Sequence, residues 1–285
     1  MNIAVTGATG FLGRRLTKLL EKRGHTVRAV SLRGAVRAEA LAGCDGVVHL
    51  AGEPVAQRWT APARQRIVES RVEGTRRLVE AMRAHRPNVL VSASAVGYYG
   101  SRGDEVLTEQ SSPGEDFLAQ TCVAWEREAL EGEKLGARLV RLRIGVVLGS
   151  GGGALEKMIT PFRLGVGGRL GDGRQWMSWI HVDDLCELIL FALKESTLRG
   201  VLNATSPHPV TNAEFTKALG RALHRPTVMR VPGFLLKVLL GEEMSGVLLG
   251  SYRVMPEGAM KAGFEFRYPD VAAALVDILA ADERR

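Results

Sequence analysis

Nine residues near the N-terminus, VTGATGFLG at positions 5–13, place the strongest constraint on the fold. Glycines occupy positions 7, 10 and 13, directly after the apolar run 3–5 and before a segment with helical periodicity. In this context Gly7 allows a tight turn, Gly10 lets a pyrophosphate approach the backbone, and Gly13 lets the helix pack close to the strand. The loop predicts a dinucleotide-binding βαβ unit, with a bare structural turn as the alternative.

The first half of the chain alternates between short apolar runs and amphipathic segments. We expect further strands at 26–31, 46–51, 88–92 and 137–142, and helices at 11–23, 63–84 and 117–131. Such alternation indicates parallel strands joined by right-handed helical crossovers, which is a doubly wound α/β sheet of Rossmann type. Residues 1–148 are therefore predicted to form a dinucleotide-binding core.

The pattern changes in the second half. Ten of the 29 residues in 145–173 are glycine, which predicts a long irregular segment that acts as a functional loop or lid. A helix is expected at 182–193 with Asp183 as its N-cap, then a strand at 201–203 and a helix that begins with a capping box at 211–214. Residues 149–285 are predicted to hold this loop, the final sheet elements and a small C-terminal substrate lobe.

Composition excludes several classes of protein. The net charge is +7, but the arginines are spread along the chain, which indicates a basic surface suited to anionic ligands rather than a nucleic-acid footprint. No apolar stretch approaches the roughly 18–20 residues that span a bilayer. No signal-peptide pattern is seen, so we expect a cytoplasmic location and no membrane partner. The isolated cysteines and histidines predict no metal site.

The end of the second strand indicates which dinucleotide is bound. An NAD site usually places an acidic residue there to bond the ribose 2′-hydroxyl. This chain instead has Ser31 and Arg33. Because a hydroxyl and a guanidinium would hold a 2′-phosphate, the sequence favours NADP(H). The alternative is that Arg33 is only a solvated loop residue.

Several motifs together resemble an atypical branch of the extended short-chain dehydrogenase/reductases. They are the glycine loop, HLAGEPV, SASAVGYYG, RIGVVLGSGGGAL, PFRLGVGGRLGDGRQWMSWIHVDDL, NATSPHPVTNAEF and RVMPEGAMKAGFEFRYPD. The resemblance is to the NAD-dependent epimerase/dehydratase-like family, whose members are sometimes labelled cell-division inhibitors and include an atypical mammalian reductase. It covers nearly the whole chain and implies a Rossmann fold, NADP binding and a C-terminal substrate lobe, without a defined substrate.

The resemblance also implies which residues contact the cofactor. The pyrophosphate would be lined by Gly7, Thr9, Gly10, Phe11 and Leu12. The adenosine side would be contacted by Ser31 and Arg33 at the 2′-phosphate, and by Leu50, Ala51 and Gly52 beneath the ribose and diphosphate. The nicotinamide side would be reached by Ser92 and Ser94. Arg71 falls where related reductases keep a cofactor-facing residue, although it could equally cap a solvated helix face.

Reductases of this superfamily use a serine, a tyrosine and a lysine. The tyrosine moves a proton, and the lysine lowers the tyrosine's pKa and bonds the nicotinamide ribose. Ser94 matches the serine, but an alignment through Glu126 puts Leu118 and Cys122 at the tyrosine and lysine positions. The usual pair is therefore expected to be absent.

Other groups could supply the missing proton. Tyr98 and Tyr99 follow Ser94 and could offer a phenol, or they could pack against the sheet or the substrate loop. Glu53 and Glu126 are further candidates, each of which could instead be a solvated or ion-paired carboxylate.

A second group of side chains suits a small organic ligand. Gln175, Trp176, Ser178 and Trp179 combine flat apolar faces with fixed polar groups after the glycine-rich segment. The alternative is that the two tryptophans belong to the core.

Two functions follow from these observations. The first is an NADP-dependent oxidoreductase or nucleotide-sugar-type epimerase that acts on an unidentified small molecule with atypical acid–base groups. The second is an NADP(H)-binding sensor or interaction protein with little or no turnover. The oligomeric state is left open, with a homodimer as one option.

Overall fold

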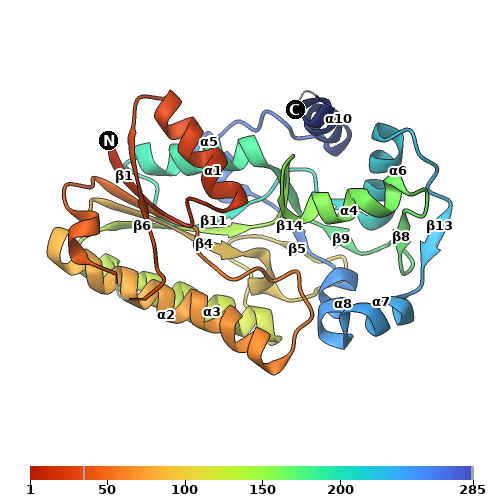
Figure 1. The fold of residues 1–285 in the computed structure, drawn as a ribbon, viewed down its shortest axis with the longest axis horizontal. Coiled ribbons are helices and arrows are strands. Elements are labelled where there is room, and N and C mark those ends of the chain that lie inside the picture. Colours follow the sequence, from red (N-terminus) through yellow and green to blue (C-terminus); the bar gives the residue numbers. More distant parts are fainter. Residues whose placement is uncertain (35, 284–285) are drawn as a thin grey trace.

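The computed structural model describes residues 1–34 and 36–283 and centres on a six-stranded parallel sheet (Figure 1). The strand order is β11-β6-β4-β3-β1-β2. The bounds are β1 Asn2–Thr6, β2 Thr26–Val30, β3 Gly46–His49, β4 Val89–Ala95, β6 Arg138–Ile144 and β11 Gly200–Ala204. All five neighbouring pairs run parallel, which confirms the doubly wound α/β sheet.

Helices cover both faces of this sheet (Figure 1). On one face, α1 (Phe11–Lys22) packs beside α5 (Val182–Lys194), and on the other, α2 (Ala61–His85) packs beside α3 (Phe117–Leu130). Leu16 and Leu188 belong to the first apolar layer, and Leu78 and Ala129 belong to the second. Strands β1, β3 and β4 are buried along almost their whole length, and the carboxyl ends of the parallel strands form the edge where ligands usually bind.

The glycine-rich segment contains more regular structure than expected. It holds β7 (Val146–Leu148), α4 (Gly153–Arg163) and β8 (Gly168–Leu170), so the prediction of one long irregular loop is wrong for most of its length. The glycines gather at the ends of these elements, where Gly151, Gly152 and Gly153 all have positive φ. The interior of α4 contains no glycine, which is why a helix forms there despite the composition.

The C-terminal lobe consists of short elements around a second apolar cluster that includes Leu155, Phe215 and Leu275. Its further strands are β9 Trp176–Met177, β10 Trp179–His181, β12 Val210–Thr211, β13 Met229–Val231 and β14 Arg253–Val254. Its further helices are α6 Asn212–Ala222, α7 Gly233–Leu240, α8 Glu242–Leu249, α9 Glu257–Lys261 and α10 Val271–Glu283.

Two-stranded sheets tie this lobe together and attach it to the first half. They pair β10 with β7, β12 with β9, β13 with β8, and β14 with β5 (Val106–Leu107). Short 3₁₀ turns complete the fold, among them η1 Ala38–Leu41, η2 Val96–Tyr99 and η3 Glu133–Leu135. Within the described part of the chain, no helix is both long and apolar enough to cross a membrane.

The helix caps agree only partly with expectation. Thr211 and Glu214 form the predicted capping box at the start of α6. At α5, however, the N-cap is His181, whose Nδ1 accepts the Asp183 backbone N–H at 3.1 Å. The expectation that Asp183 caps this helix is wrong, because Asp183 already lies inside it. The Asp183 carboxylate instead pairs with Arg15 at 3.7 Å.

Candidate functional site

The glycine loop joins β1 to α1 at the carboxyl edge of the sheet. Gly7 has φ of +71°, and a Cβ there would lie 2.9 Å from the Ala51 nitrogen. A Cβ on Gly13 would lie 2.1 Å from the Gly7 carbonyl oxygen, whereas one on Gly10 would meet only that oxygen, at 3.2 Å. Gly7 and Gly13 are thus enclosed by backbone, and Gly10 leaves an open side that a ligand can approach.

The N-terminus of α1 is free of side-chain caps. Its N-cap is Gly10, which offers no side-chain acceptor to the first backbone N–H groups of the helix. Thr9 and Gly10 are exposed beside it. Unpaired N–H groups and the positive end of the helix dipole make such a terminus a binding site for a phosphate. The cradle therefore fits a dinucleotide diphosphate.

Phe11, in the first turn of α1, does not point its ring at this opening. The ring lies against the second glycine-rich stretch, where Cβ atoms on Gly149, Gly152 and Gly153 would come within 2.9–3.0 Å of it. Leu12 packs on the apolar layer beneath α1. For Phe11 and Leu12, only the backbone is placed to face a phosphate, which corrects any expectation that their side chains line it.

The strip formed by residues 50–52 lies against the glycine loop and is held by partly buried hydrogen bonds. The Thr6 hydroxyl accepts the backbone N–H groups of Leu50 at 3.1 Å and Ala51 at 3.3 Å. It also lies 2.7 Å from His49 Nδ1. Gly52, the last residue of the strip, is exposed. The strip is therefore fixed in a position to support a ligand that lies over it.

His49 links this strip to α2. Its Nε2 lies 2.8 Å from the Thr75 hydroxyl, which donates its own proton to the Arg71 carbonyl at 2.5 Å. Thr75 must therefore accept from Nε2–H, and His49 Nδ1 must accept from Thr6. Both ring nitrogens are committed to the neutral form. Burial, assisted by the charge of Arg71, lowers the pKa of His49 to about 4.

Ser31 and Arg33 lie exposed just beyond the end of β2. The Arg33 backbone N–H donates to the Ser31 hydroxyl at 3.2 Å, which brings the two residues together. Arg33 forms no ion pair with any carboxylate that the structure describes. Its guanidinium is therefore free to meet a phosphate at this end of the sheet.

The end of β4 faces α3. Ser94 donates to Glu126 Oε1 at 2.7 Å, and Cys122 places its thiol beside the Ser94 hydroxyl and the Ala95 backbone. Leu118 packs on Gly97, where a Cβ would lie 3.3 Å from the Leu118 Cβ. Burial raises the pKa of the Cys122 thiol to about 12, so the thiol is neutral.

Ser92 does not reach the nicotinamide side as expected. It is 1% exposed within β4, and its hydroxyl contacts only the neighbouring Ala93 carbonyl, at 3.4 Å. Side chains two residues apart in a strand share a face of the sheet, so Ser94 points to the same face as Ser92. Ser94 is also buried, at 3% exposed, but it is one residue from the end of β4 at Ala95. Of the two serines, only Ser94 lies near the end of the strand.

A buried charge cluster joins α3 to β6. The Glu126 carboxylate accepts from Arg143 Nε at 2.8 Å, from Arg143 Nη2 at 3.0 Å and from Arg141 Nη1 at 3.1 Å. Arg143 also donates through Nη1 to the Tyr99 hydroxyl at 3.0 Å, and this hydroxyl donates to Asn203 Oδ1 at 2.7 Å. This cluster was not predicted, although arginines at alternate positions of an otherwise apolar strand, Arg141 and Arg143, were a signal for it.

Tyr99 is a buried structural phenol, which corrects its assignment as a catalytic candidate. It is 0% exposed, and burial raises its pKa to about 12 despite the nearby Arg143. Tyr98 remains half-buried, with its ring 3.3 Å from the Arg143 guanidinium carbon and perpendicular to the ring of Tyr99. Of the two tyrosines, only Tyr98 retains a surface.

Two of the predicted substrate residues keep an accessible surface. Trp176 is half-buried, donates from Nε1 to Asp104 at 2.8 Å and stacks on the Arg253 guanidinium at 4.3 Å. Gln175 is half-buried and donates to the Leu170 carbonyl at 3.2 Å. Both lie at the start of the lobe, where they could contact a ligand.

The other two are structural, and their expected pocket role is corrected. Ser178 is 1% exposed; its hydroxyl donates to the Tyr252 carbonyl at 2.7 Å and accepts the Val254 N–H at 2.8 Å. Trp179 is 0% exposed within the second apolar cluster, and its Nε1 donates to the His208 carbonyl at 3.0 Å. Their polar atoms are already satisfied by backbone, so neither offers a group to a ligand.

Tyr252 approaches the same region from the C-terminal lobe. It packs with Tyr98 against the small apolar cluster around Tyr99. Burial, and then the nearby Asp116 carboxyl and Cys122 thiol, raise its pKa to about 12. No sequence pattern predicts that a residue so far along the chain lies near α3, because only tertiary folding brings the two together.

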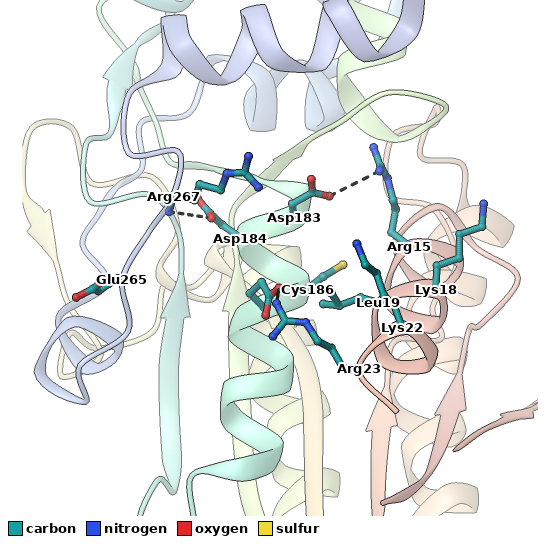
Figure 2. A pocket seen from close by; sticks show the side chains of 11 residues that line it. Arg15, Lys18, Leu19, Lys22, Arg23, Asp183, Asp184, Cys186, Glu265 and Arg267 are labelled. Carbon is teal, nitrogen blue, oxygen red and sulfur yellow. Dashed lines mark hydrogen bonds and ion pairs between the residues drawn. The ribbon is translucent and has the colours of Figure 1, made fainter. Parts of the chain in front are cut away.

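A separate cavity of about 410 Å³ lies between α1 and α5 (Figure 2). Its charged lining consists of Arg15, Lys18, Lys22, Arg23 and Arg267 against Asp183, Asp184, Glu187 and Glu265. These five cations and four carboxylates nearly cancel, and none of the residues predicted for the cofactor or the substrate lines the cavity. It therefore does not belong to the candidate site.

The fold and the glycine cradle together define a Rossmann-type dinucleotide-binding protein. Residues 3–204 match the NAD dependent epimerase/dehydratase family, and residues 231–278 match a domain of unknown function, DUF1731. The chain belongs to this epimerase family.

Curated relatives match this chain in sequence along nearly its whole length. The chain is 43% identical to the chloroplastic SDR39U1 homolog of Arabidopsis thaliana, an epimerase family protein, over 98% of this chain and 87% of that protein. It is 39% identical to the epimerase family protein YfhF of Bacillus subtilis, over 98% of each. Because one relative is described as chloroplastic, the cytoplasmic location stays a prediction.

Two solved structures share both fold and sequence. The crystal structure of human epimerase family protein SDR39U1 with NADPH matches with a TM-score of 0.91 and 34% identity, covering 100% of both chains. A nucleoside-diphosphate sugar epimerase from Corynebacterium glutamicum matches with a TM-score of 0.81 and 34% identity, covering 99% of this chain and 58% of that chain.

Proposed function

We propose that this protein binds NADP(H) and uses it in an oxidoreductase or sugar-nucleotide-epimerase type of reaction on a small organic molecule. The observation that carries the proposal is the uncapped N-terminus of α1 beside the strip 50–52, a cradle closed by Gly7 and Gly13 and open at Gly10. The human relative with NADPH in its crystal structure supports the same cofactor.

Each part of the dinucleotide has residues that would hold it. The backbone of residues 9–12 would bind the diphosphate, and Arg33 would bind the 2′-phosphate through its free guanidinium. When bound, NADP(H) supplies or accepts the hydride. Ser94, at the end of β4, would lie on the nicotinamide side, where its hydroxyl orients the substrate oxygen.

We further infer that α3 lacks the tyrosine and lysine of ordinary short-chain reductases. Leu118 and Cys122 face the end of β4 where that pair is expected, and both are unable to move a proton near neutral pH. The proton would then come from Tyr98, from Tyr252 or from water. We expect slow chemistry with simple carbonyl compounds, because general acid–base catalysis typically contributes about 10²- to 10⁴-fold in rate.

A second candidate function is an NADP(H)-binding sensor or interaction protein with little turnover. The observation that favours it is the neutral, buried Cys122 thiol beside Ser94, where a catalytic cation would otherwise lie. The two candidates share the cofactor site and differ in chemistry.

Titration and turnover separate these functions. The purified protein would be titrated with NADPH and NADH by nucleotide fluorescence, then incubated with NADP⁺ or NADPH and a panel of sugar nucleotides, alcohols and ketones. Product formation with any of them supports the enzyme. Tight NADPH binding without product across the panel supports the sensor, and no binding of either nucleotide overturns both.

A further inference from the structure

Helix α7 is apolar on its outer face as well as on its inner face. Its sequence, GFLLKVLL, contains a single charged residue, Lys237. Leu236 is buried, whereas Phe234 and Val238 are each 70% exposed and Leu235 is exposed beside them. A helix that is apolar all round is normally covered on every side. The outer face of α7 therefore lacks the partner that its composition predicts.

The three exposed side chains, Phe234, Leu235 and Val238, form one stripe, which we call the α7 stripe. Residues three and four apart share a face of a helix, so Val238 lies beside both of the others. Helix α7 packs on α8 at the outer edge of the C-terminal lobe, away from the six-stranded sheet (Figure 1). Uncovered apolar side chains that gather in this way mark an interaction surface, whereas single ones do not.

Opposite charges lie just beyond the two ends of the α7 stripe. Arg230 precedes the helix and is exposed, and Glu242 follows the helix and begins α8. Arg230 is four positions before Phe234, and Glu242 is four positions after Val238. The apolar side chains and the flanking charges are therefore symmetric in sequence about the same point, position 236, with opposite signs at the two ends.

Both flanking charges can face another molecule. Glu242 pairs with Lys237 at 3.0 Å, but both side chains are more than half exposed, and exposed pairs of this kind contribute little. Arg230 directs its Nε at the Gly171 carbonyl at 2.7 Å and forms no ion pair with any carboxylate that the structure describes. Neither group is thus held in a buried pair within the chain.

We propose that the α7 stripe is the interface of a homodimer, in which α7 packs antiparallel on α7 of a second copy about a two-fold axis near position 236. A two-fold axis brings the same patch of both copies together, so a stripe that is symmetric about its own middle is complementary to itself. The arrangement covers the apolar side chains of both copies and places Arg230 of each copy near Glu242 of the other. A different protein would not require this symmetry. Nothing in this interface depends on the proposed cofactor.

Sedimentation velocity of the full chain between about 1 and 100 µM would measure the association. We expect wild type to form a dimer with a dissociation constant in the micromolar range, because three apolar side chains per copy make a small interface. Phe234→Glu and Val238→Glu should each weaken the dimer at least about tenfold, since each places like charges across the axis. Val276→Glu is the matched control, because Val276 is an exposed valine on α10, and it should change nothing.

Charge reversal tests the two-fold geometry itself. Arg230→Glu meets Glu242 of the second copy with a like charge, and Glu242→Arg meets Arg230 in the same way. Each variant alone should be more monomeric than wild type at low salt. An equimolar mixture of the two variants should form a heterodimer, because both of its contacts then join opposite charges. Circular dichroism and thermal midpoints would show that each variant is folded.

Three outcomes would overturn the proposal. A wild type that stays monomeric over this concentration range assigns the α7 stripe to a different protein or to a lipid surface, and not to a second copy. A dimer that survives both Phe234→Glu and Val238→Glu has its interface on another face of the molecule. Charge variants that do not associate when mixed, although the apolar variants disrupt the dimer, would show that the two helices do not pack antiparallel.

Discussion

The Ser94 hydroxyl donates to the Glu126 carboxylate at 2.7 Å, so the serine next to the proposed nicotinamide position is already hydrogen-bonded within the protein. The same carboxylate neutralises Arg143, which is 3% exposed. Ser94 can therefore meet a substrate only through its lone pairs, because its O–H is directed at Glu126. One carboxylate thus sets both the orientation of the serine and the stability of the buried arginine.

Replacing Glu126 should destabilise the fold strongly. Glu126→Gln leaves the buried Arg143 without a counter-charge, and breaking a buried pair from one side costs about 3–5 kcal/mol. Urea denaturation followed by circular dichroism would measure the free energy of unfolding. Glu80→Gln removes an exposed partner of Arg83 and should cost under about 1 kcal/mol. Similar losses for both variants would contradict the role given to the cluster.

His49 should make stability depend on pH. Its pKa is lowered from 6.5 in the unfolded chain to about 4 in the fold. Between pH 4 and 6.5, His49 is mostly protonated in the unfolded chain and mostly neutral in the folded protein. The free energy of unfolding should therefore fall by roughly 3 kcal/mol as pH drops from 6.5 to 4 on account of this residue.

The difference between wild type and His49→Gln isolates this contribution, because the other titrating groups are common to both. Denaturation curves at half-unit pH steps should show a shallower slope for the variant between pH 4 and 6.5. Parallel curves would mean that folding does not lower the pKa of His49 and that its bonding is misassigned.

Arg33 should decide between the two dinucleotides. Arg33→Ala is expected to weaken NADPH binding about tenfold, because it removes a charge-assisted contact to the 2′-phosphate. NADH binding should be unchanged, since NADH lacks that phosphate. Fluorescence titration of both nucleotides measures the effect, with Arg37→Ala as the control from the same exposed stretch. Equal affinity of wild type for NADPH and NADH would refute the assignment.

Gly13 and Gly246 should differ sharply in how well they tolerate substitution by alanine. A methyl group on Gly13 would lie 2.1 Å from the Gly7 oxygen, so Gly13→Ala must move α1 away from its loop. We expect a loss of about 1–3 kcal/mol in stability, together with loss of NADPH binding. Gly246→Ala on α8 meets nothing within 4 Å and should gain about 0.5–1 kcal/mol. Normal nucleotide binding by Gly13→Ala would show that the cradle is not the binding site.

Simple ketones and aldehydes should be reduced slowly or not at all. The expected cause is the pair Leu118 and Cys122, which offers neither a phenol nor an ammonium to the substrate oxygen. An NADPH oxidation assay of wild type, Tyr98→Phe and Tyr252→Phe measures this directly. If turnover is slow and one substitution abolishes it, that tyrosine is the proton donor. Brisk turnover that survives both would place the acid elsewhere.

The sheet, the glycine cradle and most helices could be predicted because their signals are local. An apolar run, a glycine spacing or a capping box at Thr211 and Glu214 is fixed by neighbouring residues in the chain. The 145–173 segment was misjudged for the same reason. Glycine content describes the average of a segment, whereas α4 depends on where the glycines fall within it.

The site was harder to predict because burial is a tertiary property. Tyr99, Ser178 and Trp179 have suitable chemistry, but the fold covers each of them and satisfies its polar atoms. Conversely, Tyr252 comes to α3 from the far end of the chain, and no spacing in the sequence predicts this proximity. Residue type therefore identified candidate site residues, but only the tertiary packing shows which of their side chains a ligand can reach.

The ring of Phe11 explains why the second glycine-rich stretch, residues 149–153, contains so many glycines. The Phe11 ring fills the space that side chains on Gly149, Gly152 and Gly153 would occupy. These glycines therefore form a close-fitting site for the ring and not a flexible hinge. A bulkier residue at any of these glycines would push against the first turn of α1, where we propose that the phosphates bind. These glycines therefore serve close packing and not flexibility. They let the first turn of α1 fit against the start of α4, although the two helices are far apart in the sequence.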